Sequence, residues 1–421
     1  MADERQVHAI VDAETTLPRP AAGARRAVFA CVFVPLVLIY ALTAQWRLPY
    51  HIDALTNAIT GWYIGNEGTV IADQHNALTA PDAYAQLGWF VESPKGTVGQ
   101  YPPGAALVAG GFYAVTPGGL VDHHLGGSNK TGAAAVTVGV PPLWPATLSA
   151  VLTSAAAAAV LALVFLGLGG DRRAAIGGGL AFGLATGAWS IASAASWTHG
   201  PAMLAVALGL LGAQRDRWAL SGAAFGYAIL TRPHLAVIAA AVGLGVSWRR
   251  RRPGPALGLG LAASVGLVAL LAHNNHIWGE PSISGGYGDG FEEQFAHSGL
   301  GWFVSNVWGG LVDPRHGLLP WAPFVGLLAI GAVAERRHLP DWSLAAAVGG
   351  VVYLLIQWRA NSFAGGKGHS GYRYPLEMLT ACAPVFFVGY QRWVAPRPVA
   401  VKLLTVGVAI GFAGQLTASV A

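Results

Sequence analysis

The sequence predicts an all-α fold: a polytopic transmembrane helical bundle of about eleven spans, with interfacial helices on its outer face. First, 54% of the 421 residues are hydrophobic and only 11% are charged, whereas soluble domains carry about 25% charged residues. Second, the apolar residues gather in runs close to the length of a membrane span. Third, lipid offers no partners to unpaired backbone groups, so such runs favour helices.

The first 27 residues are polar and end at Arg25-Arg26, which predicts a disordered cytoplasmic tail. The apolar run 27–44 lacks a clean small-residue cleavage site, so we interpret it as a retained signal anchor rather than a signal peptide. Residues 28–421 are expected to form a single transmembrane domain. Its further runs cover 145–168, 174–192, 200–213, 217–231, 234–248, 256–272, 318–334, 342–357, 375–390 and 398–419.

Charge indicates the orientation. With a cytoplasmic N-terminus, 17 of the 25 Lys and Arg residues fall in cytoplasmic segments, as the positive-inside rule expects. The run 103–117 is too short to cross and is read as an interfacial or re-entrant helix on the outer side. The outer loops are then 46–144, 273–317 and 358–374. The sequence thus predicts a multi-pass protein of the cytoplasmic (inner) membrane with an extracytoplasmic active face.

Two polar motifs lie in the first outer loop. Asp53 begins an expected amphipathic helix and is either a general base or a helix N-cap. Tyr101 belongs to the turn YPPG before the short apolar run, where prolines fix an extended chain. Two more motifs follow between spans. His199 in WTHGP is either a hydrogen-bond donor to a phosphate or a plain loop residue. Arg232 in TRPH either binds an anion or extends its charged end to the membrane interface.

The later outer loops hold further candidates. HNNH places His273 and His276 three residues apart, which keeps a divalent metal open as an alternative. SGGYGDG, with Tyr287, lacks the ending of a phosphate loop and is read as a flexible flap. Arg315 in DPRHG is another anion candidate. The glycine-rich segment 365–375 precedes a helix start, which favours either anions or a solvated loop. It carries three basic candidates: Lys367, His369 and Arg373.

These outer residues suit an anionic lipid headgroup at the interface with a base ready for an acceptor. The chain has no dinucleotide fingerprint, no Walker loop and no basic stripe, which excludes hydride transfer, nucleotide hydrolysis and nucleic acid binding. We expect five residues to bind the phosphate of such a headgroup: Arg232, Arg315, Arg373, Lys367 and His369. We expect four to line the substrate pocket: His51, Tyr101, His199 and Tyr287.

The order of these motifs resembles the GT-C superfamily of integral-membrane glycosyltransferases, in particular bacterial proteins similar to protein O-mannosyltransferases and the aminoarabinose transferase of lipid A. The resemblance runs from about residue 28 to 390. It includes the early acid Asp53, YPPG, WTHGP, TRPH, PRHGLL and a GGxxxGxRY loop.

The resemblance implies an inverting sugar transfer from a polyprenyl-phosphate donor to a glycan, lipid or protein acceptor at the outer face, with Asp53 as base. Many relatives carry two adjacent acids where this chain has His51 before Asp53. The lysine that begins a KPP-type turn in some relatives is replaced by Gln100-Tyr101, which moves phosphate contacts to Lys95 or Lys367.

Three different functions compete with sugar transfer. A transporter or flippase of a lipid-linked sugar would place charged or unwound positions near mid-membrane, preferably in repeated halves. The sequence shows few acids or lysines inside the spans and no internal repeat, which favours the enzyme. A non-catalytic scaffold would leave the many polar outer residues unexplained. A ligase that uses a diphosphate donor is the third competing hypothesis.

Overall fold

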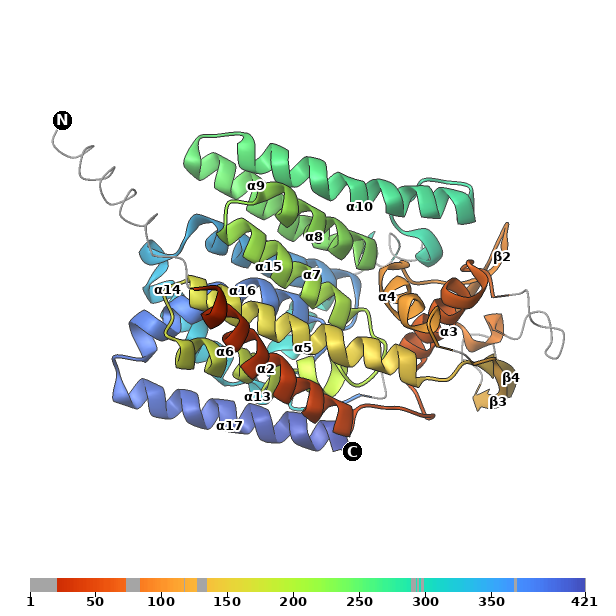
Figure 1. Ribbon diagram of the computed structural model, residues 1–421, viewed down its shortest axis with the longest axis horizontal. Coiled ribbons are helices and arrows are strands. Elements are labelled where there is room, and N and C mark those ends of the chain that lie inside the picture. Colours follow the sequence, from red (N-terminus) through yellow and green to blue (C-terminus); the bar gives the residue numbers. More distant parts are fainter. Residues whose placement is uncertain are drawn as a thin grey trace.

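A computed structural model describes residues 21–72, 84–116, 118–126, 135–288, 293, 295–296, 299–366 and 369–420. The structure is 72% helix and 5% strand, which confirms the predicted all-α class. Figure 1 shows most helices running side by side in one bundle, with a smaller group of elements at one end.

The helices of the first half are α2 (Ala22–Thr43), α3 (Ile52–Glu67), α4 (Gly104–Tyr113), α5 (Trp144–Gly167), α6 (Arg172–Leu184), α7 (His199–Gln214) and α8 (Trp218–Thr231). Those of the second half are α9 (Ala236–Arg250), α10 (Gly254–Trp278), α12 (Leu300–Val312), α13 (Leu318–Trp321), α14 (Phe324–Ala334), α15 (Asp341–Ala360), α16 (Pro375–Gly389) and α17 (Pro398–Val420). Single turns occur at η3 (Ala85–Leu87), η4 (Ala188–Ala192), η5 (Pro233–Leu235), η6 (Gly285–Tyr287), η7 (Arg336–His338) and η8 (Tyr390–Val394).

Helices occupy the predicted apolar runs, but 318–334 is divided between α13 and α14, and α6 ends at Leu184, before the end of the run 174–192. Within the described residues, five helices are long and apolar enough to cross a membrane: α2, α5, α10, α15 and α17. These helices differ in how much of their most apolar 18-residue stretch is buried. The buried share is 72% in α5 but only 22% in α2, α10 and α17. α5 is therefore a central helix, and the other three leave broad apolar faces uncovered. The predicted disordered tail falls largely on residues 1–20, outside the described part of the chain.

Glycines bring helices close together, as small residues do in membrane bundles. On α8 and α10, a Cβ at Gly266 would lie 2.0 Å from the Gly226 carbonyl oxygen. On α3 and α4, a Cβ at Gly65 would lie 2.5 Å from the Gly110 carbonyl oxygen. Any larger side chain at Gly266 or Gly65 would push these helix pairs apart.

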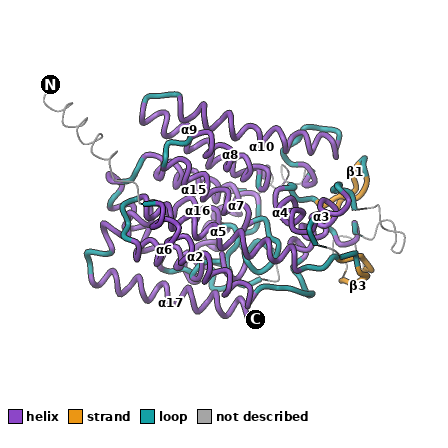
Figure 2. The backbone as a smooth tube through the Cα atoms, in the orientation of Figure 1, coloured by secondary structure: helices purple, strands orange, loops and turns teal. Residues whose placement is uncertain are grey.

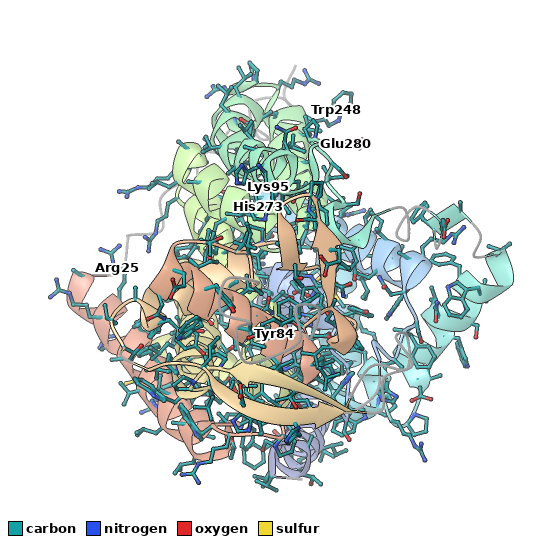
Figure 3. The ribbon with its side chains drawn as sticks, turned by 90° about the vertical axis from the view of Figure 1, so that its right-hand side faces the viewer. Arg25, Tyr84, Lys95, Trp248, His273 and Glu280 are labelled. Atoms are coloured by element: carbon teal, nitrogen blue, oxygen red, sulfur yellow. The ribbon has the colours of Figure 1, made fainter. Side chains whose placement is uncertain are left out.

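One end of the bundle carries α3, α4 and two β-hairpins (Figures 1 and 2). β1 (Phe90–Ser93) pairs antiparallel with β2 (Gly96–Gly99), Phe90 opposite Gly99. β3 (Val121–Gly126) pairs antiparallel with β4 (Ala135–Val140), Val121 opposite Val140. Figure 3 looks onto this end, where Tyr84 and Lys95 are labelled.

The two short helices at this end differ in how far they match expectation. Ten residues of α4 rise about 15 Å, half of a hydrocarbon core of about 30 Å, which agrees with the prediction that 103–117 does not cross. The helix predicted after His51 is present as α3. However, residues 53–63 are all buried, so the expected amphipathic surface helix is wrong over that stretch. It packs against α4, β2 and α5 instead.

Candidate functional site

The predicted base Asp53 forms an ion pair with Arg373. Arg373 Nη1 donates to Asp53 Oδ2 at 2.7 Å, and 13% of each side chain is exposed. Asp53 is not the N-cap of α3, because that position belongs to His51, whose Nδ1 accepts from the Asp53 backbone N–H at 3.3 Å. The capping alternative is therefore wrong for Asp53, and its carboxylate points to Arg373 instead.

The backbone and aromatic rings around Arg373 hold its side chain in place. Gly365 has a φ of +70°, and a Cβ there would lie 2.6 Å from Arg373 Nε, so this turn of the GGxxxGxRY loop requires glycine. The Arg373 Cζ lies 5.0 Å from the ring centroid of Trp197 and 5.2 Å from that of Tyr374. These cation–π contacts fix the guanidinium beside the start of α16.

Electrostatics keep Asp53 ionised. Burial raises the pKa of Asp53, but the charges of Arg373 and His51 and hydrogen bonds from Arg373 and Tyr101 outweigh it, so the pKa lies below its usual value. Burial and the Asp53 charge raise the pKa of Tyr101 well above its usual value, so that hydroxyl stays protonated. Tyr287 packs edge-on against Tyr101, with 6.1 Å between the ring centroids.

A second carboxylate, Glu377, lies fully buried in the first turn of α16. His199 Nδ1 lies 2.8 Å from Glu377 Oε1, and Arg232 Nη1 lies 3.3 Å from the same oxygen. Tyr353 donates its hydroxyl to Glu377 Oε2 at 3.0 Å. Arg232 Nη2 also donates to Gln357 Oε1 at 3.2 Å. Arg232 therefore does not snorkel to the surface, because it is buried against a carboxylate.

The YPPG and TRPH motifs are in contact, and this contact determines where Arg232 lies. A Cβ at Gly104 would lie 2.3 Å from Thr231 Oγ1 and 2.6 Å from Thr231 Cα. Tyr227 donates its hydroxyl to the Gly104 carbonyl at 2.6 Å. The glycine that ends YPPG is therefore the contact that lets the end of α8, with Arg232 directly after it, approach the first loop.

The WTHGP loop connects the two ion pairs. Asn57 of α3 donates to the Ser196 carbonyl at 2.9 Å, and the Ser196 N–H donates to the Tyr50 hydroxyl at 2.8 Å. These bonds hold Trp197 over Arg373 and His199 against Glu377. Tyr374 also lies between the guanidiniums, 6.0 Å from the Arg232 Cζ. The pairs Asp53–Arg373 and Glu377–Arg232 thus form one cluster, which we call the paired-charge site.

Half-buried histidine rings flank this site. His369 lies 6.3 Å from His51 and 5.7 Å from His316, measured between ring centroids. Both His369 ring nitrogens are buried and have no hydrogen-bond partner among the described residues. Burial, with the charge of Arg373 and the neighbouring histidines, lowers the pKa of His369 to about 3.

This lowered pKa predicts a pH effect on stability. An unfolded-chain histidine protonates near pH 6.5, whereas His369 in the folded chain stays neutral down to about pH 3. The unfolded state therefore binds more protons in this window, and folding stability falls as the pH falls from 6.5. We expect His369→Asn to lose less stability between pH 7 and pH 5 than the wild type, measured by thermal unfolding in detergent. His276→Asn, at an exposed position of α10, is the control; an unchanged pH dependence in His369→Asn would contradict the prediction.

Some predicted residues lie elsewhere. The Arg315 side chain is exposed, although its carbonyl accepts from the Gly371 N–H at 2.9 Å. Lys95 is exposed at the β1–β2 turn (Figure 3), and Lys367 lies outside the described residues. The structure therefore brings together seven of the predicted residues: Asp53, Arg232, Arg373, His369, His51, Tyr101 and His199. Tyr287 joins them through Tyr101.

Two central residues were not singled out from the sequence. The first is Glu377: an acid inside the apolar run PLEMLTAC is costly unless it is paired, and that signal could have found it. The second is Trp197 of the WTHGP motif, whose ring lies against the Arg373 guanidinium. Within the described ranges, no three His, Cys, Asp or Glu side chains gather closely enough to hold a metal ion.

Comparison with known proteins adds no assignment: no protein-family model matches the chain, and no curated protein matches it. The GT-C resemblance therefore stays a prediction from the sequence.

Proposed function

We propose that this chain is a membrane glycosyltransferase of the GT-C kind, which transfers a sugar from a polyprenyl-phosphate donor to an acceptor hydroxyl with inversion. The observation that carries the proposal is the Asp53–Arg373 contact of 2.7 Å beside the buried Arg232. A candidate base and two candidate phosphate ligands thus share one site, although Asp53 and Arg373 are 320 residues apart.

The paired-charge site contains hydrogen-bond donors that an oxyanion could engage. Arg373 Nε and Gln357 Nε2 are buried without a hydrogen-bond partner among the described residues. Buried donors without partners are costly, and a phosphate oxygen would satisfy them. Guanidinium groups suit phosphate because their N–H donors are arranged as a planar fork.

Donor binding would also activate the base. A phosphate that bonds Arg373 competes with Asp53 for the same guanidinium, which frees the carboxylate and raises its basicity. Asp53 then accepts the proton of the acceptor hydroxyl. The acceptor oxygen forms its bond to the anomeric carbon, and the bond from that carbon to the phosphate oxygen breaks. The polyprenyl phosphate leaves with the electron pair, and Arg232 and Arg373 stabilise its charge.

The proposal includes a topology of eleven crossings in the cytoplasmic membrane. Its support is the helices over the apolar runs together with the unequal distribution of Lys and Arg. The N-terminus is then cytoplasmic, and the paired-charge site lies at the extracytoplasmic face. The partners are the lipid-linked donor, a hydroxyl-bearing glycan, lipid or protein acceptor, and membrane lipids.

Loss of an arginine ligand should weaken use of the donor. Removing a hydrogen bond to a charged group costs about 1.5–3 kcal/mol, so we expect Arg373→Ala to lower kcat/KM for the donor by about 10- to 100-fold. Arg373→Lys should recover only part of this, because lysine lacks the fork. The measurement is release of polyprenyl phosphate from labelled donors by purified protein.

Arg315→Ala is the matched control, since that side chain is exposed and outside the cluster. Equal losses in Arg315→Ala and Arg373→Ala would mean that general surface charge, not the paired-charge site, attracts the donor. Unchanged kinetics in Arg373→Ala would remove the phosphate role from this residue.

A further inference from the structure

A shallow depression lies between α2, α5 and α7, and basic side chains surround it. Six residues line it: Ala22, Arg25, Arg26, Phe29, Leu163 and Arg215. It adjoins the start of α2, at the opposite end of the bundle from α3 and α4 (Figure 1). Figure 3 shows Arg25 at the margin of the molecule. None of the six lining residues contributes to the paired-charge site.

The depression combines cations with apolar side chains. Three arginines line it together with Phe29 and Leu163. Phe29 stacks on Phe33 one turn further along α2, with 5.3 Å between ring centroids. Phe29 and Phe33 are half-buried against the core, and only 22% of the most apolar 18-residue stretch of α2 is buried, so the exposed parts of this aromatic pair lead from the arginines along a largely uncovered helix.

Local packing fixes the third arginine relative to the other two. Gln214 Nε2 donates to the Val164 carbonyl at 2.8 Å, which holds the end of α7 against the end of α5. A Cβ at Gly167 would lie 2.6 Å from Gln214 Oε1, so a small residue is needed for this contact. Arg215 follows directly, and α2 packs along α5, which brings Arg25 and Arg26 to the same place.

We propose that this arginine depression binds the phosphate headgroup of an anionic phospholipid, with an acyl chain along Phe29 and Phe33. Guanidiniums bind phosphate oxygens by charge-assisted hydrogen bonds, and basic pockets between membrane helices are suited to anionic headgroups. A free phosphate would use only the cations. The stacked rings of Phe29 and Phe33 beside the arginines favour an amphiphile, and this site does not depend on the proposed sugar transfer.

The test is binding of phosphatidylglycerol to the purified full-length chain in neutral detergent, followed by native mass spectrometry. At about 1 kcal/mol per arginine near a membrane surface, Arg25→Gln/Arg26→Gln/Arg215→Gln should bind on the order of 100-fold more weakly. The matched control removes three exposed arginines outside the depression: Arg249→Gln/Arg252→Gln/Arg337→Gln. It should bind as the wild type does, and phosphatidylcholine should bind weakly to all three proteins.

Phe29→Ala distinguishes a lipid from a free anion. We expect it to weaken phosphatidylglycerol binding several-fold while the three arginines remain. Equal binding by the arginine triple variant and the wild type would overturn the proposal, as would an equal loss in the control triple variant, since the attraction would then be diffuse. Full competition by inorganic phosphate, together with no effect of Phe29→Ala, would assign the depression to a free anion and overturn the lipid.

Discussion

Replacing Asp53 by asparagine should abolish sugar transfer while the chain stays folded. General-base catalysis typically contributes about 10²- to 10⁴-fold, and an amide cannot accept the proton of the acceptor hydroxyl. The amide oxygen can still accept the hydrogen bond that Arg373 Nη1 now gives to Asp53 Oδ2, so the neighbourhood of the guanidinium is retained. The measurement is single-turnover release of polyprenyl phosphate under saturating donor.

The control for this substitution is Asp122→Asn, an exposed acid on β3. Its turnover should equal that of the wild type, and both variants should unfold within a few degrees of it. Wild-type turnover by Asp53→Asn would remove the base assignment. An unfolded Asp53→Asn chain would be uninformative about catalysis, so Asp53→Glu serves as the companion: it keeps the charge but moves the carboxylate by one methylene, and we expect strongly reduced turnover with an intact fold.

Replacing Glu377 by alanine should destabilise the folded chain more than any other single change at the site. Glu377 is fully buried and has three partners, His199, Arg232 and Tyr353. Breaking a buried ion pair by removing one partner costs about 3–5 kcal/mol, because the remaining charge stays buried without compensation. Thermal unfolding in detergent measures this loss.

A double substitution separates the stability of this pair from its role at the site. Removing both charges can be nearly neutral for stability, so Glu377→Gln/Arg232→Met should unfold close to the wild type. It should nevertheless use the donor poorly, because one phosphate ligand is gone. If Glu377→Ala unfolds at the wild-type temperature, the buried pair does not stabilise the fold. If the double variant has wild-type donor kinetics, Arg232 does not bind phosphate.

The sequence predicted the fold class well because apolar runs and the need for internal backbone hydrogen bonds determine it directly. The distribution of Lys and Arg also predicted that Asp53, Arg232 and Arg373 lie on the same side of the membrane. The structure brings these three side chains into one cluster. Sequence could not predict the pairing itself. Asp53 and Arg373 are 320 residues apart, and their contact depends on the tertiary packing that brings α3 to the loop before α16.

The predictions that failed depended on tertiary packing. A helix with polar Asp53, Thr56 and Asn57 resembles a surface helix, but α4 and β2 cover α3 and its polar groups find partners inside. Asp is a favoured N-cap, yet α3 begins at Ile52, so His51 takes that position and the Asp53 carboxylate bonds Arg373 instead. Arg315 is exposed, and its carbonyl accepts from the Gly371 N–H; its role at a phosphate stays a prediction.

The fate of a labelled donor in proteoliposomes tests the central proposal most directly, namely that the paired-charge site cleaves a polyprenyl-phosphate sugar. A panel of such donors, each labelled in the sugar, is supplied with hydroxyl acceptors to wild-type protein and to Asp53→Asn. We predict that the wild type releases one polyprenyl phosphate for each labelled acceptor, with inverted anomeric configuration, and that Asp53→Asn releases none. Intact donor that crosses the bilayer without cleavage, equally in both proteins, would contradict the transferase and identify a flippase.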